Sequence, residues 1–183
     1  MLHRALREWG YACEVIAPSL IPMRPGVQRK HDKRDAADLA RFYRAGELVV
    51  VRIPSEAEER VRDVVRCRET FQREILKSRH YILKFLARRG FVFREGTNWC
   101  TPHLRWLQHL TTEASPLAPH DRLVYREYHA LLLYKLQRRE ELDRQIEQLA
   151  LLPTLAPMVR RLQCFRGISL HSAMVRATFS TRW

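Results

Sequence analysis

The stretch that decides the fold is DRLVYREYHALLLYKLQRREELDRQIEQLAL, residues 121–151. Its apolar residues recur at intervals of three and four, which is typical of an amphipathic helix. They are Tyr125, Tyr128, Leu132, Leu142, Ile146 and Leu149. Lys135 and Arg139 occupy two positions along the same seam and weaken it. The pattern predicts one long helix over about residues 121–151, with an apolar face that charges interrupt.

A second long helix is expected ahead of it, over about residues 56–89. Ser55 and Glu58 have the spacing of a capping box, and Gly90 ends the pattern. The residues expected to point inward are Val61, Val64, Val65, Ile75, Ile82 and Leu86. Two long helices in succession favour an antiparallel pair. We expect this coiled-coil-like arm to join copies of the chain into a homo-oligomer.

Before the arm, the sequence predicts a small α/β portion. Residues 13–17 and 48–53 are short apolar or β-branched runs, typical of strands. A helix is expected over about 33–45, with Gly46 as its stop, after a loop over 18–31 that holds three prolines. Its inward residues should be Ala36, Leu39, Ala40 and Tyr43. Two strands alone form a marginal sheet, so the predicted fold is mostly α with a partial α/β layer.

The remaining segments carry weaker patterns. Residues 2–9 look like the tail of an amphipathic helix, and residues 91–120 predict short helices with irregular connections. Residues 158–168 predict a helix that ends at a tight turn on Gly167. From Ser169 onward we find no coherent pattern.

Composition and charge narrow the class of partner. The chain has 183 residues, of which 46% are hydrophobic, so it can form a core. Its net charge of +13 and isoelectric point of about 10.3 favour a polyanion, most simply DNA or RNA. No apolar run approaches membrane-spanning length, and no signal peptide is evident. The four scattered cysteines are expected to be reduced thiols in a cytoplasmic protein.

The residues best suited to bind a metal ion or a phosphate lie in and next to the stretch KHDKRDA, residues 30–36. Asp32 and Asp35 stand three residues apart, so a helix places them on one face, where two carboxylates can bind Mg²⁺. Neighbouring cations suit a phosphate-bearing partner: Arg29, Lys30, Lys33 and Arg34. An ordinary explanation also holds. Asp32 can be a helix cap, Asp35 an acid favoured by the helix dipole, and the cations a solvated face.

Zinc is a weaker hypothesis. Cys100, His103 and His109 could be imagined as ligands, but their spacing matches no common structural site and no second cysteine accompanies them. The six glycines are scattered singly, so no glycine-rich phosphate loop is expected.

Several segments resemble the DEDD transposases of the insertion sequence 110 family. They are APSLIP at 17–22, KHDKRDA at 30–36, LAR at 39–41 and RAGEL at 44–48, followed by REELDRQIE at 139–147 and FRGI at 165–168. The resemblance covers most of residues 2–168. It implies a Mg²⁺-dependent recombinase that moves DNA, in some members guided by a bridge RNA.

The resemblance also implies a domain plan. Residues 1–54 would be the C-terminal part of an RNase H/RuvC-like DEDD domain. Residues 55–152 would form the long-helix region, and residues 153–183 the start of a C-terminal transposase domain, truncated or out of frame. Asp32 and Asp35 match the last two acids of the catalytic tetrad, and the chain contains neither earlier position. We therefore expect an inactive fragment that retains nucleic-acid binding.

Two alternatives stay open. One is a non-enzymatic basic module that binds DNA or RNA, or regulates, through its helices. It predicts salt-sensitive binding that does not depend on Asp35. The other is a helical structural protein that happens to be basic, whose association would depend on Leu142 and Ile146.

Overall fold

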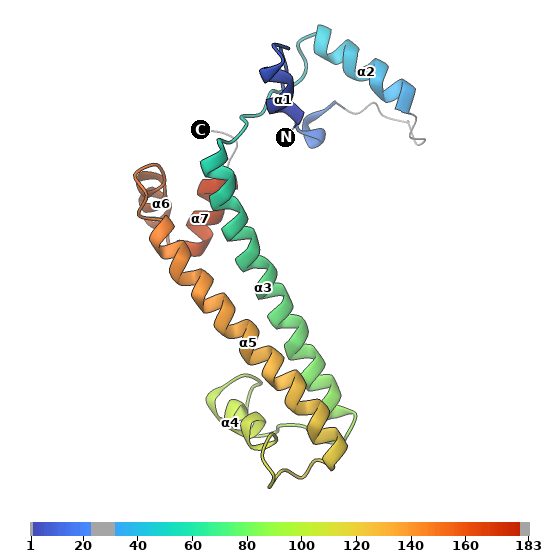
Figure 1. The fold of residues 1–183 in the computed structure, drawn as a ribbon, viewed down its shortest axis with the longest axis vertical. Helices are drawn as coiled ribbons and strands as arrows, with labels where there is room; N and C mark the ends of the chain where they lie inside the picture. Colours follow the sequence, from blue (N-terminus) through green and yellow to red (C-terminus); the bar gives the residue numbers. More distant parts are fainter. Residues whose placement is uncertain (1, 23–31, 180–183) are drawn as a thin grey trace. The chain divides into compact units, whose positions relative to one another are not determined.

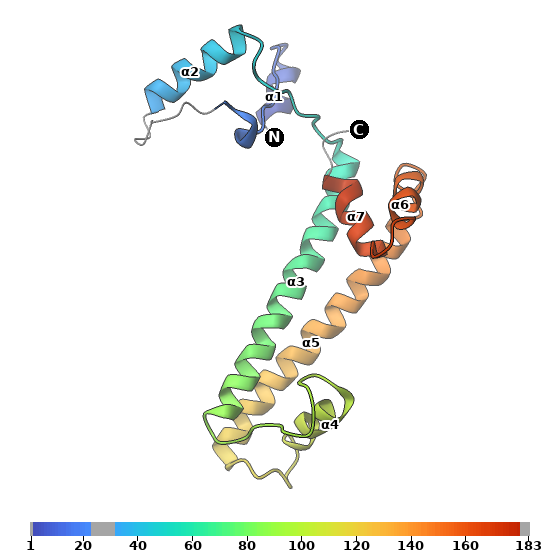
Figure 2. The ribbon, with the colours of Figure 1, turned by 180° about the vertical axis from the view of Figure 1, so that it is seen from behind.

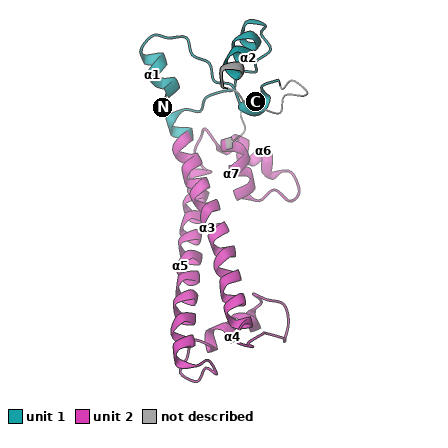
Figure 3. Ribbon diagram, turned by 90° about the vertical axis from the view of Figure 1, so that its right-hand side faces the viewer, with its two compact units in different colours: residues 1–58, 179–183 teal, residues 59–178 magenta. Residues whose placement is uncertain are grey.

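The fold is known from a computed structural model that describes residues 2–22 and 32–179. Its elements in chain order are α1 (Leu2–Glu8), η1 (Pro18–Leu20, a 3-10 helix), α2 (Asp32–Arg44), α3 (Glu56–Ala87), α4 (Thr101–His109), α5 (Pro119–Leu149), α6 (Ala156–Gln163) and α7 (Leu170–Phe179). The prediction of a mostly helical protein is confirmed. Figure 3 divides the chain into unit 1, Met1–Glu58 with Phe179–Trp183, and unit 2, Glu59–Thr178.

The two long helices form the predicted antiparallel pair in unit 2. Figures 1 and 2 both show α3 and α5 side by side near α4, and the two helices diverge toward α6 and α7. Ile75, Ile82 and Leu86 of α3 and Tyr125 and Leu132 of α5 belong to one buried cluster. Burial of such side chains contributes about 1.5–3 kcal/mol each, so this seam is the main source of stability in unit 2.

The two cations expected to weaken the seam have polar partners across it. The Lys135 ammonium donates to Ser78 Oγ at 2.9 Å and lies 3.5 Å from a Glu74 carboxylate oxygen. Arg139 donates to Gln72 Oε1 at 3.4 Å. Because Ser78 is only 3% exposed, the lysine satisfies a buried hydroxyl that an apolar residue would leave unpaired.

Local signals place the ends of α3 as predicted. The Ser55 amide donates to Glu58 Oε2 at 2.8 Å, and the Glu58 amide donates to Ser55 Oγ at 3.3 Å, which forms the capping box. At the other end, Gly90 has a φ of +80°, and the Phe91 amide donates to the Leu86 carbonyl at 3.1 Å. Glycine adopts this left-handed conformation without strain, so it stops the helix.

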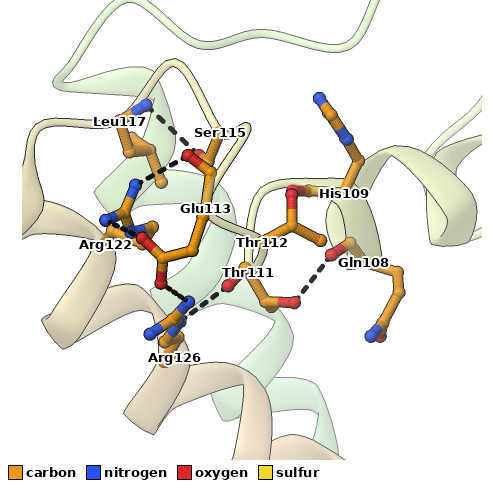
Figure 4. Close-up of polar contacts among 9 residues, drawn as sticks. All are labelled: Gln108, His109, Thr111, Thr112, Glu113, Ser115, Leu117, Arg122 and Arg126. Atoms are coloured by element: carbon orange, nitrogen blue, oxygen red, sulfur yellow. Dashed lines mark hydrogen bonds and ion pairs between the residues drawn. The ribbon is translucent and has the colours of Figure 1, made fainter.

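The loop between α4 and α5 is held by one acid and two arginines (Figure 4). Glu113 accepts from Arg122 at 2.5 Å and from Arg126 at 2.7 Å, and Arg126 Nε also donates to the Thr111 carbonyl at 2.6 Å. The hydrogen bond from Arg126 and the charge of Arg122 lower the pKa of Glu113. These two arginines therefore act within the fold.

The C-terminal residues form a helix that the sequence pattern did not predict. Instead of lacking a pattern after Ser169, the chain forms α7, in which Ala173 and Met174 are fully buried. Arg62 of α3 donates to the Thr178 carbonyl, which fixes α7 beside the first turns of α3. The helix was missed because its apolar positions are set by contacts with α3, and the segment is too short for a periodic signal of its own.

Unit 1 departs from the expected α/β layer. The predicted strands are reduced, among the described residues, to one antiparallel bridge between Ile16 and Val50. The helix α2 is confirmed, but its predicted inward residues are wrong: Ala36, Leu39, Ala40 and Tyr43 are exposed, and Phe42 is buried. A single pair of strands cannot cover a helix face, because a sheet needs more strands to be stable. Residues 2–22 and 32–179 show no RuvC-like layer.

We expect Ile75→Ala to lower the free energy of unfolding of unit 2 by about 2–5 kcal/mol, because it opens a cavity in the seam. The matched control is Leu76→Ala on the same helix, where the side chain is 46% exposed. It should change stability by less than about 0.5 kcal/mol. Urea unfolding followed by circular dichroism measures both, and equal losses would contradict the assigned seam.

Candidate nucleic-acid interface and metal site

The predicted acid pair lies at the start of α2. Asp32 is the first residue of the helix, and Asp35 follows three residues later with an exposed side chain. This is the position in which the helix dipole favours an acid. The positions of Asp32 and Asp35 therefore fit a shared metal ion. They fit equally well the ordinary role of acids at the start of a helix.

The predicted phosphate contacts are close to this helix start in the sequence. Arg29 and Lys30 lie outside the described residues, and Lys33 and Arg34 fall in the first turn of α2. Contact between these four cations and nucleic acid stays a prediction.

One turn further along, α2 is internally paired. Arg41 contacts Asp38 at 3.1 Å, and the Arg41 guanidinium lies 5.3 Å from the centre of the Phe42 ring. Asp38 is thus committed to a partner within the helix, whereas Asp35 faces solvent. The difference makes Asp38 a control for experiments on Asp35.

A complete magnesium site is not assembled within the described part of the chain. No group of three or more His, Cys, Asp or Glu side chains lies close enough to hold a metal within residues 2–22 and 32–179. Mg²⁺ requires near-octahedral coordination, so Asp32 and Asp35 could provide only part of its oxygen ligands.

The zinc hypothesis finds no support in the described part of the chain. His103 is fully buried and packs against Phe93, Trp99 and Trp106, with ring centres 4.9–5.6 Å away. Its Nδ1 accepts a hydrogen bond from the Trp99 amide at 2.7 Å. Burial among these rings lowers the pKa of His103, so the ring is neutral and structural. All four cysteines of the chain are free.

The cations of unit 2 fall into two classes. Many form ion pairs within unit 2, such as Arg68–Asp143 at 2.7 Å and Arg89–Asp121 at 2.6 Å. Others form no ion pair with any described residue: Lys84, Arg88, Arg94, Arg105, Arg160, Arg161, Arg166 and Arg176. The sequence could not separate these classes, because a partner such as Asp143 lies 75 residues from Arg68. Phosphate contacts in unit 2 should come from the second class.

Sequence reasoning also missed the exposed aromatic residues among these cations. Tyr81 is 58% exposed beside Lys84 and Arg88, and Phe165 is 65% exposed next to Arg166. For Tyr81, the available signal was an aromatic residue three positions before Lys84 on one predicted helix. In addition, no helix in the described ranges is both long and apolar enough to cross a membrane.

Two curated proteins are similar to the chain along nearly its whole length. One is y4qE of Sinorhizobium fredii, provisionally named a transposase, which is 33% identical over 179 residues. The other is the transposase for insertion sequence element IS1533 of Leptospira borgpetersenii, which is 29% identical over 175 residues. The aligned residues cover 97% and 94% of this chain, but only 41% and 49% of the two relatives. No family model and no solved structure matches.

Unit 2 should lose stability as the pH falls below about 6.5, because His103 is neutral when buried and gains a proton when unfolded. The unfolded state binds more protons between the two pKa values, so stability is complete above this window and declines through it. Unfolding followed by tryptophan fluorescence between about pH 7.5 and pH 5 measures the effect.

His103→Gln should flatten this pH dependence, whereas His109→Gln, at an exposed position of the same helix, should leave it unchanged. The remaining slope comes from His129 and His171, whose pKa values are also lowered by burial. An unchanged slope in His103→Gln would show that the buried imidazole is not the titrating group.

Proposed function

We propose that this chain is part of a transposase that moves DNA by a Mg²⁺-dependent DEDD reaction. The observation that carries the proposal is the similarity to two proteins named as transposases, over 97% and 94% of the chain. The DEDD class rests on the resemblance of residues 17–22 and 30–36 to insertion sequence 110 transposases. The chain spans less than half of each relative, so the reaction belongs to the whole protein.

Within that reaction, Asp32 and Asp35 would supply two of the carboxylates that hold Mg²⁺ near a phosphodiester. Their spacing on α2 and the exposure of Asp35 support this role. One carboxylate pair rarely holds a two-metal site, so the chain by itself should be catalytically inactive. Arg29, Lys30, Lys33 and Arg34 would position the DNA backbone beside the acids.

The proposed partners are DNA, a guide RNA and a second copy of the chain, with the cytoplasm as the place of action. A homo-oligomer would use exposed apolar side chains of α5, among which Leu123, Leu131 and Leu133 are 46–61% exposed. Ile146 is 2% exposed and packs inside this chain.

The alternative is a non-enzymatic module that binds DNA or RNA through its basic helices. The net charge of +13 and the unpaired cations of unit 2 favour it as well. The two proposals differ in one respect: only the transposase needs the carboxylates of α2 for a metal-dependent property.

Duplex DNA should bind with a steep dependence on salt, because Lys and Arg displace counterions from the phosphates. With about five phosphate contacts, affinity should fall roughly 500-fold between about 50 and about 200 mM salt. A gel-shift titration at the two concentrations measures the change. A flat response would favour a structural protein that is basic without binding nucleic acid.

Asp35→Asn should remove any contribution of Mg²⁺ to DNA binding, because it replaces a charged metal ligand by a neutral one. The quantity to compare is the ratio of the dissociation constants with EDTA and with Mg²⁺ at constant ionic strength. Asp38→Asn is the matched control, since it makes the same charge change on the same helix at an acid paired with Arg41.

Three outcomes are informative. A ratio above one that falls to one in Asp35→Asn and persists in Asp38→Asn supports the transposase proposal. Equal ratios in all three proteins favour the non-enzymatic module. Cleavage or joining of DNA by the chain with Mg²⁺, lost in Asp32→Ala, would contradict the expected inactivity.

A further inference from the structure

The surface of unit 2 has a hollow of about 420 Å³ between α3 and α5. It is lined by Tyr81, Lys84, Ala87 and Arg88 of α3 and by Tyr128 of α5. None of these residues belongs to the predicted acid pair, which lies in unit 1. The lining combines two phenol rings with two cations around a small side chain, and no part of the fold described above uses that combination.

Packing explains why a hollow exists here. Ala87 offers only a methyl group among larger neighbours, so it leaves space beside them. Packing holds the Tyr128 ring in place, because this ring contacts the buried Phe85 ring edge to face, with ring centres 5.6 Å apart. Tyr81 is 58% exposed. The hollow is therefore lined by one ring held in place, that of Tyr128, and by one exposed ring, that of Tyr81, which a ligand can contact.

The charges at the hollow are uncompensated. Lys84 and Arg88 follow Tyr81 by three and seven residues, so the helix places all three on one face. Neither cation forms an ion pair with a described residue, whereas Lys77 contacts Glu74 at 2.7 Å and Arg89 contacts Asp121 at 2.6 Å. Two cations stay free in a region where their neighbours are paired, which leaves a local positive charge for an anion.

We propose that this hollow binds single-stranded DNA, with a base stacked on Tyr81 and the adjoining phosphates on Lys84 and Arg88. An unpaired nucleotide is the ligand that uses both features, because it offers a free aromatic face beside a phosphodiester. Duplex DNA keeps its bases stacked on one another, and an acidic peptide would leave the ring unused. The choice of DNA over RNA rests on the proposed function.

The experiment measures the affinity of the whole chain for a fluorescent oligo-dT of about twelve nucleotides by anisotropy. Tyr81→Ala should weaken binding about tenfold or more, because stacking of one base is lost. Tyr81→Phe should retain affinity, since the ring alone stacks. The matched control is Tyr134→Ala on α5, where the tyrosine is 57% exposed outside the hollow. Circular dichroism of each variant checks the fold.

The cations give a second test. Lys84→Ala and Arg88→Ala should each weaken oligo-dT binding and lower the slope of affinity against salt by about one unit. Lys77→Ala is the control, because its ammonium is already paired with Glu74. Equal effects of Lys77→Ala and Lys84→Ala, or of Tyr81→Ala and Tyr134→Ala, would overturn the site.

Further measurements test this inference separately from the proposed function. Tyr81→Ala should leave both duplex binding and the effect of Mg²⁺ at Asp35 unchanged. A loss confined to oligo-dT supports the hollow even where the metal experiment fails, and an equal loss on duplex DNA overturns the assignment to unpaired bases. Binding of oligo-U without binding of oligo-dT would overturn the choice of DNA.

Discussion

The contact on which unit 2 depends is the apolar seam between α3 and α5. Ile75, Ile82 and Leu86 meet Tyr125 and Leu132 there, and the Tyr125 hydroxyl donates to the Leu107 carbonyl of α4 at 2.8 Å. Without this burial neither long helix would be stable in water, because propensity alone contributes little. The tyrosine-lined hollow also needs the two helices in register, because α3 and α5 both contribute to its lining.

Packing along the seam also determines which lysine and arginine side chains remain available to bind a partner. A chain with a net charge of +13 has far more cations than it can neutralise, yet many arginines of the arm are engaged in holding helices and loops. Those that remain define the surfaces that can meet phosphate. In the proposed function, a polyanion would therefore contact local positive surfaces such as the one around Lys84 and Arg88.

The sequence predicted where the candidate site lies on α2. It predicted only partly which residues of α2 are buried. The KHDKRDA stretch predicted a helix start, and the structure places Asp32 and Asp35 in the first turn. Its predicted inward face is exposed, however, because few residues of unit 1 lie against it and Phe42 is its buried residue. Periodicity shows which side chains share a face. It does not show whether another element covers that face.

The sequence by itself determined the two long helices and the limits of α3, since caps and stops are local: Ser55 and Glu58 begin α3, and Gly90 ends it. It also determined the antiparallel pairing, because two long amphipathic stretches follow one another. Only the tertiary structure decided that Lys135 would satisfy Ser78 and that α7 would form. These outcomes depend on contacts between residues far apart in the chain, and no local pattern records which distant side chain fills a given space.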